Sequence, residues 1–209
     1  SDGIYVDATY GRGHSTEILK KLSKRGKLIA FDMDAESEKY VLDDDRLIYI
    51  NHNYKYISNY LDYLGIRKVN GFLLDLGISS NHIDIKERGF SYRYDDAPLD
   101  MRMDRNIGLT ASEILNTYDE ESLGEIFKKY GEVTNYRIIA SNIVSYRNKA
   151  KINNVGDLKK AINIIDNKAN IKLLSQIFQA LRIVVNDELK SLSLFLEQSV
   201  DYLKEGGRL

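Results

Sequence analysis

Three carboxylates mark the ends of short apolar runs in the first eighty residues: Asp7, Asp32 and Asp75. Apolar runs of this length, alternating with helical patterns, predict a mostly parallel sheet covered on both faces. The carboxyl ends of parallel strands share one edge of the sheet, where open α/β sheets bind ligands. We therefore expect acidic side chains around a ligand site at this edge.

A glycine-containing turn, GRGHS, follows Asp7 at residues 11–15. Glycine lets the backbone approach a ligand, and the next helix presents its first amides there. The dinucleotide pattern G-x-G-x-x-G is broken because Thr16 stands at the third glycine position, so a nicotinamide oxidoreductase is the weakest interpretation. Asp7 would repel a pyrophosphate but attract the sulfonium and amine of S-adenosylmethionine. A tight turn without a ligand is the alternative.

Other residues fit a nucleoside site beside this turn. Asp32 follows Gly11 by 21 residues, a spacing at which a carboxylate commonly accepts hydrogen bonds from ribose hydroxyls. Tyr54 could cover an adenine, with ordinary packing as the alternative. Asp75 could accept hydrogen bonds from an exocyclic amine and favour its nucleophilic form, or it could contact the cofactor instead.

The segment 87–104 mixes arginines with aromatic residues and methionines, and it contains the only proline. Such loops can order over a nucleotide, with arginine on phosphate and aromatic rings on bases. Arg88, Phe90 and Arg102 are the candidate substrate contacts. A surface loop packed by its own side chains is the alternative.

The elements that must position these residues follow from periodicity. We predict strands over 3–7, 27–31, 47–50 and 71–76, and a helix capped by Ser15 that runs to about residue 24. Helical patterns without strands fill 105–170, including one with Leu158 and Ile165. A long helical pattern then runs from about 170 through Leu203, before a new strand begins at the end.

The composition excludes several classes of protein. The chain has 209 residues, a net charge of −1, no cysteine and three scattered histidines, so disulfides and thiol catalysis are excluded and a histidine-rich metal site is not expected. Without a long apolar run or a secretory signal, we expect a soluble, cytoplasmic protein with no membrane partner. Residues 128–160 hold eight basic and two acidic residues, a local excess that favours contact with RNA phosphates.

Six sequence blocks together resemble one known family. They are DATYGRGHS (7–15), FDMD (31–34), LLDLGISS (73–80), ERGFSY (87–92), PLDMRMD (98–104) and QALRIVVNDEL (179–189). In this order they resemble the bacterial RsmH (MraW) family of methyltransferases, which use S-adenosylmethionine to methylate N4 of a cytidine in 16S rRNA of the small ribosomal subunit.

The resemblance implies a Rossmann-like methyltransferase core over 1–104 and 175–209, with a helical insertion for rRNA recognition over 105–174. It also implies a homodimer. Asp75 is the candidate catalytic residue. The residues implied to line the cofactor are Gly11, Arg12, Gly13, His14, Asp32, Tyr54, Asp75 and His82.

Departures from the family pattern keep alternatives open. The turn has one glycine fewer than the usual G-x-G-G-H-S, and Asn81-His82 replaces Pro-Gln. Residues 92–97 form a segment that is one residue longer. We expect further sequence at both ends, because the fourth strand would otherwise have an uncovered edge unless a partner covers it. A degenerate cofactor-binding homologue, or a methyltransferase acting on another substrate, is the alternative function.

Overall fold

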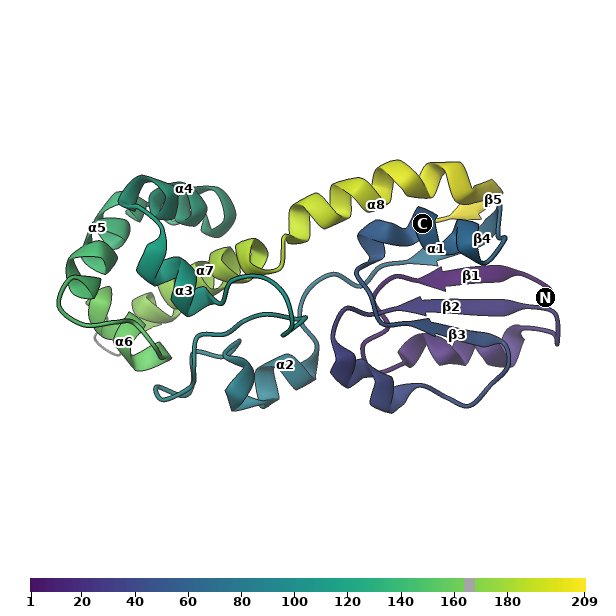
Figure 1. Cartoon of the computed structure of the whole chain (residues 1–209), viewed down its shortest axis with the longest axis horizontal. Helices are drawn as coiled ribbons and strands as arrows, with labels where there is room; N and C mark the ends of the chain where they lie inside the picture. Colours follow the sequence, from purple (N-terminus) through teal and green to yellow (C-terminus); the bar gives the residue numbers. More distant parts are fainter. Residues whose placement is uncertain (164–167) are drawn as a thin grey trace. The chain divides into compact units, whose positions relative to one another are not determined.

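The computed structural model describes residues 1–163 and 168–209 and divides the chain into two compact units (Figure 1). One unit combines 1–77 with 188–209 and contains the sheet; the other, 78–187, is helical. The helical unit is longer than the predicted insertion, 105–174. On its N-terminal side, Leu99 and Met101 belong to the same buried cluster as the helices. The predicted position of Ile165 lies outside the described residues.

The sheet has five parallel strands in the order β3-β2-β1-β4-β5. The Rossmann-like α/β fold class is therefore confirmed. The strands are β1 (Ile4–Asp7), β2 (Lys27–Phe31), β3 (Leu47–Ile50), β4 (Val69–Leu73) and β5 (Leu203–Arg208). The fourth strand ends at Leu73, before the predicted residue 76, because the N–H of Asp75 donates to the Thr9 hydroxyl instead of to a neighbouring strand.

Helices cover both faces of the sheet (Figure 1). On one face, α1 (Ile57–Tyr63) packs with α8 (Glu188–Tyr202), and Phe195 of α8 is fully buried against Phe72. On the other face, Leu19 packs on Leu28 of β2. Short 3₁₀ helices complete this unit: η1 (His14–Lys21), η2 (Ala35–Tyr40) and η3 (Tyr54–Tyr56).

The expected open edge of the fourth strand is not observed. β5 pairs with β4 in parallel, with Val69 opposite Leu203 and Gly71 opposite Arg208. The helical pattern of the sequence predicts a helix through Leu203. The residue instead starts this strand, because its backbone pairs with that of β4.

The first helix also differs from the prediction. Gly13, not Ser15, occupies the N-cap position of η1, and no side chain caps the helix. The Thr16 hydroxyl donates to the Gly13 carbonyl at 2.6 Å. Ser15 lies within the first turn and is buried, so it cannot serve as the cap.

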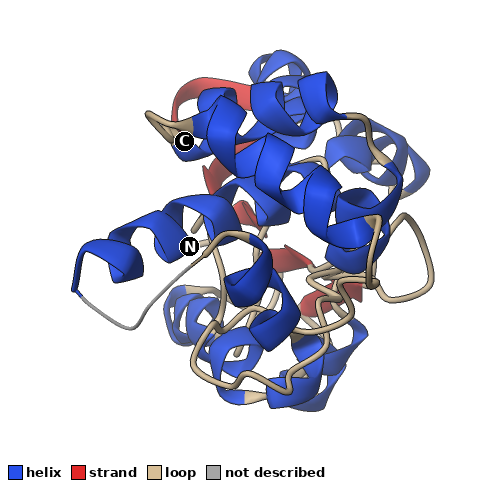
Figure 2. Cartoon of the chain, turned by 90° about the vertical axis from the view of Figure 1, so that its left-hand side faces the viewer, coloured by secondary structure: helices blue, strands red, loops and turns tan. Residues whose placement is uncertain are grey.

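The helical unit packs its helices around one large apolar cluster. Figure 2 shows the helices in blue. Leu123, Phe127, Ile143, Leu158 and Leu181 are among its fully buried members. The helices are α2 (Ser80–Asp84), η4 (Lys86–Arg88), α3 (Ala111–Thr117), α4 (Glu120–Gly131), α5 (Tyr136–Arg147), α6 (Val155–Ala161) and α7 (Lys168–Val185).

The predicted long C-terminal helix is divided into α7 and α8 at Asn186 and Asp187. The Asn186 amide donates to the carbonyl of Met101 at 2.8 Å and accepts from the N–H of Met103 at 2.7 Å. Asp187 adopts a left-handed conformation, φ 51°. The helix ends here because Asn186 binds a segment distant in the sequence, which helical periodicity does not reveal.

Gly89 of the ERGFSY block lies against the backbone of the PLDMRMD block. Its φ is 73°, and a Cβ placed on it would lie 2.1 Å from the carbonyl oxygen of Pro98. The N–H of Met101 donates to the carbonyl of Arg88 at 3.0 Å. The two blocks therefore cross in direct backbone contact, which only glycine permits at this position.

Replacing Gly89 with alanine tests this crossing. We expect Gly89→Ala to lower the free energy of unfolding by more than about 3 kcal/mol, because a backbone clash adds to the unfavourable φ. Gly65→Ala is the matched control: its φ is 68° with nothing within 4 Å of the added Cβ, so it should cost only about 1–2 kcal/mol. Urea unfolding measures both. Equal losses would contradict the proposed contact.

Candidate functional site

The glycine turn is a compact structure at the carboxyl end of β1. Gly11 and Gly13 both have left-handed backbones, with φ values of 54° and 77°. The N–H of Gly13 donates to the carbonyl of Tyr10 at 2.8 Å, which closes the turn. The side chains of Arg12 and His14 are exposed. The turn therefore brings together four of the predicted cofactor residues.

Asp32 binds directly to this turn. Its Oδ2 accepts from the N–H of Gly11 at 2.7 Å, and its Oδ1 accepts from the N–H of Asp34 at 2.8 Å. Burial raises the pKa of Asp32, opposed by these backbone hydrogen bonds. Each carboxylate oxygen has a second lone pair, so Asp32 can accept a further hydrogen bond from a ligand hydroxyl.

Asp7 lies beneath the same edge and is almost fully buried. Its Oδ1 accepts from the N–H of Thr9 at 2.9 Å. Burial raises the pKa of Asp7, and the negative charge of Asp32 adds to the effect, whereas the nearby Ser15 hydroxyl and the Thr9 N–H lower it. Two carboxylates that repel one another in a poorly solvated place favour a bound cation.

Asp75 lies beside the turn through Thr9, a residue that the sequence analysis did not select. The Thr9 hydroxyl accepts from the N–H of Asp75 at 2.7 Å, while the N–H of Thr9 binds Asp7. Thr9 thereby joins the ends of β1 and β4. The Asp75 side chain is exposed, so its carboxylate can meet a substrate. The sequence signal that could have identified Thr9 is its position directly after Asp7-Ala8, at the end of the first strand.

Tyr54 is a core-facing residue in this structure. Its ring packs edge-on against Phe195, with centroids 5.6 Å apart. Burial raises the pKa of its hydroxyl to about 12, with a smaller contribution from Glu188. This packing matches the alternative stated for Tyr54, and its contact with an adenine stays a prediction.

The remaining predicted residues lie in the helical unit. His82 stacks on Phe90 with centroids 4.6 Å apart, and both are buried. Arg88 is also buried, and its Nη2 donates to the carbonyls of Arg102 and Met103 at 3.0 Å. These contacts support the crossing of the two blocks. Direct contact of these residues with cofactor or substrate stays a prediction.

The eight basic residues of 128–160 differ in their surroundings. Arg147 donates to the carbonyls of Leu115 and Tyr118 and so caps α3. Lys159 and Lys160 pair with aspartates. On α4 and α5, cations lie over tyrosine rings at 5.1–5.5 Å; the pairs are Lys128 and Arg137 with Tyr136, and Lys129 with Tyr130.

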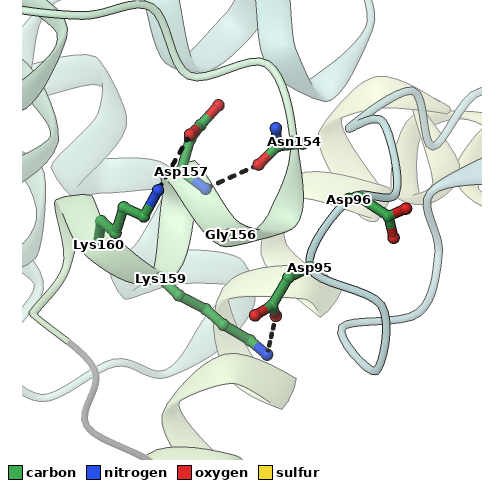
Figure 3. Close-up of a pocket in the computed structure, with 7 residues that line it drawn as sticks. All are labelled: Asp95, Asp96, Asn154, Gly156, Asp157, Lys159 and Lys160. Atoms are coloured by element: carbon green, nitrogen blue, oxygen red, sulfur yellow. Dashed lines mark hydrogen bonds and ion pairs between the residues drawn. The ribbon is translucent and has the colours of Figure 1, made fainter.

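A hollow of about 430 Å³ opens near α6 in the helical unit (Figure 3). Charged side chains that pair with one another line much of it: Lys159 lies 2.7 Å from Asp95, and Lys160 lies 3.9 Å from Asp157. Lys159 and Lys160 belong to the basic segment 128–160, which the charge pattern predicts to contact RNA. Asp96, Asn154 and Gly156 complete the lining.

The parallel sheet, the glycine turn after β1 and the carboxylate after β2 define a Rossmann-like protein of the methyltransferase class. Comparison with family models agrees, because the MraW methylase family matches residues 1–209. The chain belongs to this family. Within 1–163 and 168–209, no helix is both long and apolar enough to cross a membrane.

Curated relatives match the chain along its whole length. It is similar to Ribosomal RNA small subunit methyltransferase H of Flavobacterium psychrophilum, with 49% identity over 100% of this chain and 72% of the relative. The protein of the same name from Bacteroides thetaiotaomicron is 45% identical over 100% of this chain and 69% of the relative. That of Porphyromonas gingivalis ATCC 33277 is 46% identical, over 100% and 68% respectively.

The state of Asp32 predicts a pH dependence of cofactor binding. Protonation removes the negative charge that strengthens a hydrogen bond from a ligand hydroxyl and leaves a weaker, neutral acceptor; the pKa of Asp32 is raised above the ordinary 3.8. Affinity for S-adenosylmethionine, the cofactor that the family resemblance implies, should therefore fall on acidification, starting at a higher pH than an ordinary aspartate would give.

Calorimetric titration from neutral to acidic pH measures this effect. Asp32→Asn should bind on the order of 10- to 100-fold more weakly at neutral pH, with a flatter pH profile. Asp43→Asn, which changes an exposed carboxylate in the same unit, serves as the control. A normal affinity and profile for Asp32→Asn would contradict the assignment.

Proposed function

We propose that the protein transfers a methyl group from S-adenosylmethionine to N4 of a cytidine in 16S rRNA of the small ribosomal subunit. The observation that carries this proposal is the 44–49% identity, along essentially the whole chain, to relatives named Ribosomal RNA small subunit methyltransferase H. A second copy of the chain is the proposed oligomeric partner, on the resemblance alone.

The residues of the turn suit this cofactor. A Cβ on Gly11 would meet only the Thr9 carbonyl oxygen, at 3.8 Å, so the backbone leaves open space for a ligand. Asp32 can accept from ribose hydroxyls, and the negative charge of Asp7 suits a sulfonium and an ammonium group. When bound, S-adenosylmethionine supplies an electrophilic methyl group. Gly11, Gly13 and Asp32 are the residues that we propose to hold it.

Asp75 is the proposed acceptor for the substrate amine. The lone pair of a cytosine amine is delocalised into the ring, which makes the nitrogen a poor nucleophile. A hydrogen bond from the amine to the exposed Asp75 carboxylate favours the pyramidal form. With the cofactor bound, the bond from N4 to the methyl carbon would form as the sulfonium's sulfur–carbon bond breaks and leaves a neutral thioether, and the proton released by the amine would pass to the Asp75 carboxylate.

The surface of α4 and α5 supports an RNA substrate. Cations beside the partly buried rings of Tyr130 and Tyr136 offer positive charge for phosphates. The guanidinium of Arg147 is instead occupied by two backbone carbonyls. Lys128 is also ion-paired, 3.6 Å from Glu125. We therefore assign RNA contact to Lys129 and Arg137 rather than to all eight basic residues.

The decisive experiment is methyl transfer to small ribosomal subunits that lack the modification. Labelled S-adenosylmethionine and nucleoside mass spectrometry should reveal N4-methylated cytidine. Label on a different nucleoside would point to another substrate. Cofactor binding without transfer would support a degenerate homologue, the alternative that the shortened glycine turn favours.

Charge removal from α4 and α5 tests the RNA surface. The double variant Lys129→Gln/Arg137→Gln should weaken binding to the subunit by about tenfold and flatten its salt dependence, because two phosphate contacts are lost. The matched control is Lys20→Gln/Lys39→Gln, with the same charge change on exposed, ion-paired lysines of the sheet unit. Filter binding at several salt concentrations measures both. Equal effects would refute a specific surface.

A further inference from the structure

The side chain of Tyr10 joins the glycine turn to the segment that follows β2. It is 2% exposed, and its hydroxyl donates to the carbonyl oxygen of Tyr40 at 2.8 Å. Tyr40 is the last residue of η2, which begins three residues after Asp32. One buried hydroxyl therefore links the loops that leave two adjacent strands.

The backbone of the turn packs directly against this pair. A Cβ on Gly13 would lie 2.8 Å from the Tyr10 hydroxyl oxygen and 3.2 Å from the Tyr40 carbonyl oxygen. Both distances are shorter than a carbon–oxygen van der Waals contact. Gly13 is thus in contact with the hydrogen-bonded pair, and the hydroxyl determines how closely the turn approaches η2.

The ring of Tyr10 has little freedom to move. Its centroid lies 5.5 Å from that of Tyr49 on β3. The N–H of Tyr10 donates to the carbonyl of Phe31 at 2.9 Å, which extends the pairing of the sheet to this residue. Because both the backbone and the ring of Tyr10 are held in place, its side chain can fix the position of the turn backbone at Gly13, which contacts it.

We propose that Tyr10 is a positioning residue for the cofactor-binding turn. Its hydroxyl sets the spacing between the Gly11–Gly13 backbone and the Asp32 carboxylate, which are themselves joined by the 2.7 Å hydrogen bond from the Gly11 N–H. Without the hydroxyl, the turn shifts relative to Asp32. A ligand then cannot contact the Gly11–Gly13 backbone and the Asp32 carboxylate in the same geometry. This inference rests on the proposed function for its ligand, but the turn geometry can be tested separately.

Tyr10→Phe removes only the hydroxyl. We expect the Kd and KM for S-adenosylmethionine to rise about 3- to 10-fold, the effect of one buried hydrogen bond, with kcat changed by less than about twofold. Amide hydrogen exchange at residues 11–13 in the ligand-free protein should become faster. Tyr49→Phe is the matched control: it removes a buried hydroxyl from the contacting ring, and that hydroxyl makes no hydrogen bond within 3.5 Å among the described residues, with the Asn51 side chain as its polar neighbour.

The outcomes separate the two proposals. Unchanged exchange at residues 11–13 in Tyr10→Phe overturns the positioning role, whatever the ligand. Faster exchange with unchanged Kd and KM overturns its link to the cofactor. Faster exchange with a weaker Kd in Tyr10→Phe alone, at an unfolding midpoint that leaves the protein folded, supports the proposal. Wild-type protein that does not bind S-adenosylmethionine overturns the proposed function, while the exchange result still decides the turn geometry.

Discussion

Hydrogen bonds from backbone amides to polar side chains hold the ligand edge of the sheet together. Asp32 accepts from Gly11, Asp7 accepts from Thr9, and the Thr9 hydroxyl accepts from Asp75. Amides that leave a strand end have no ladder partner, and a buried carboxylate without donors is strongly destabilising. Each group satisfies the other, so the turn and the strand ends form one connected unit.

The same arrangement gives the edge its electrostatic character. Burial raises the pKa of both Asp7 and Asp32, and the charge of Asp32 raises that of Asp7 further. The backbone amides compensate these charges only in part. A ligand that carries positive charge and hydroxyl donors relieves this imbalance, whereas a pyrophosphate would increase it.

Local patterns in the sequence were sufficient for β1 to β3, the position of the glycine turn and the acidic residues at the strand ends. Short continuous apolar runs, separated by helical patterns, predict β1 to β3 almost to the residue, because a buried parallel strand needs a continuous apolar segment. The misplaced features depend on partners far along the chain. Asn186 ends α7 by binding residues 101–103, and β5 forms by pairing with β4. Neither contact leaves a periodic signal.

The division of the chain also orders events during its synthesis. The helical unit is continuous, 78–187, whereas the sheet unit needs both 1–77 and 188–209. Phe195, fully buried in the apolar cluster of the sheet unit, leaves the ribosome only after the whole helical unit has been made. Strands β1 to β4 must therefore wait, incompletely covered, for a segment more than a hundred residues downstream. A chain paused in translation before α8 exposes the apolar residues that Phe195 covers. Chaperones that bind exposed apolar surface have the largest area available during this interval.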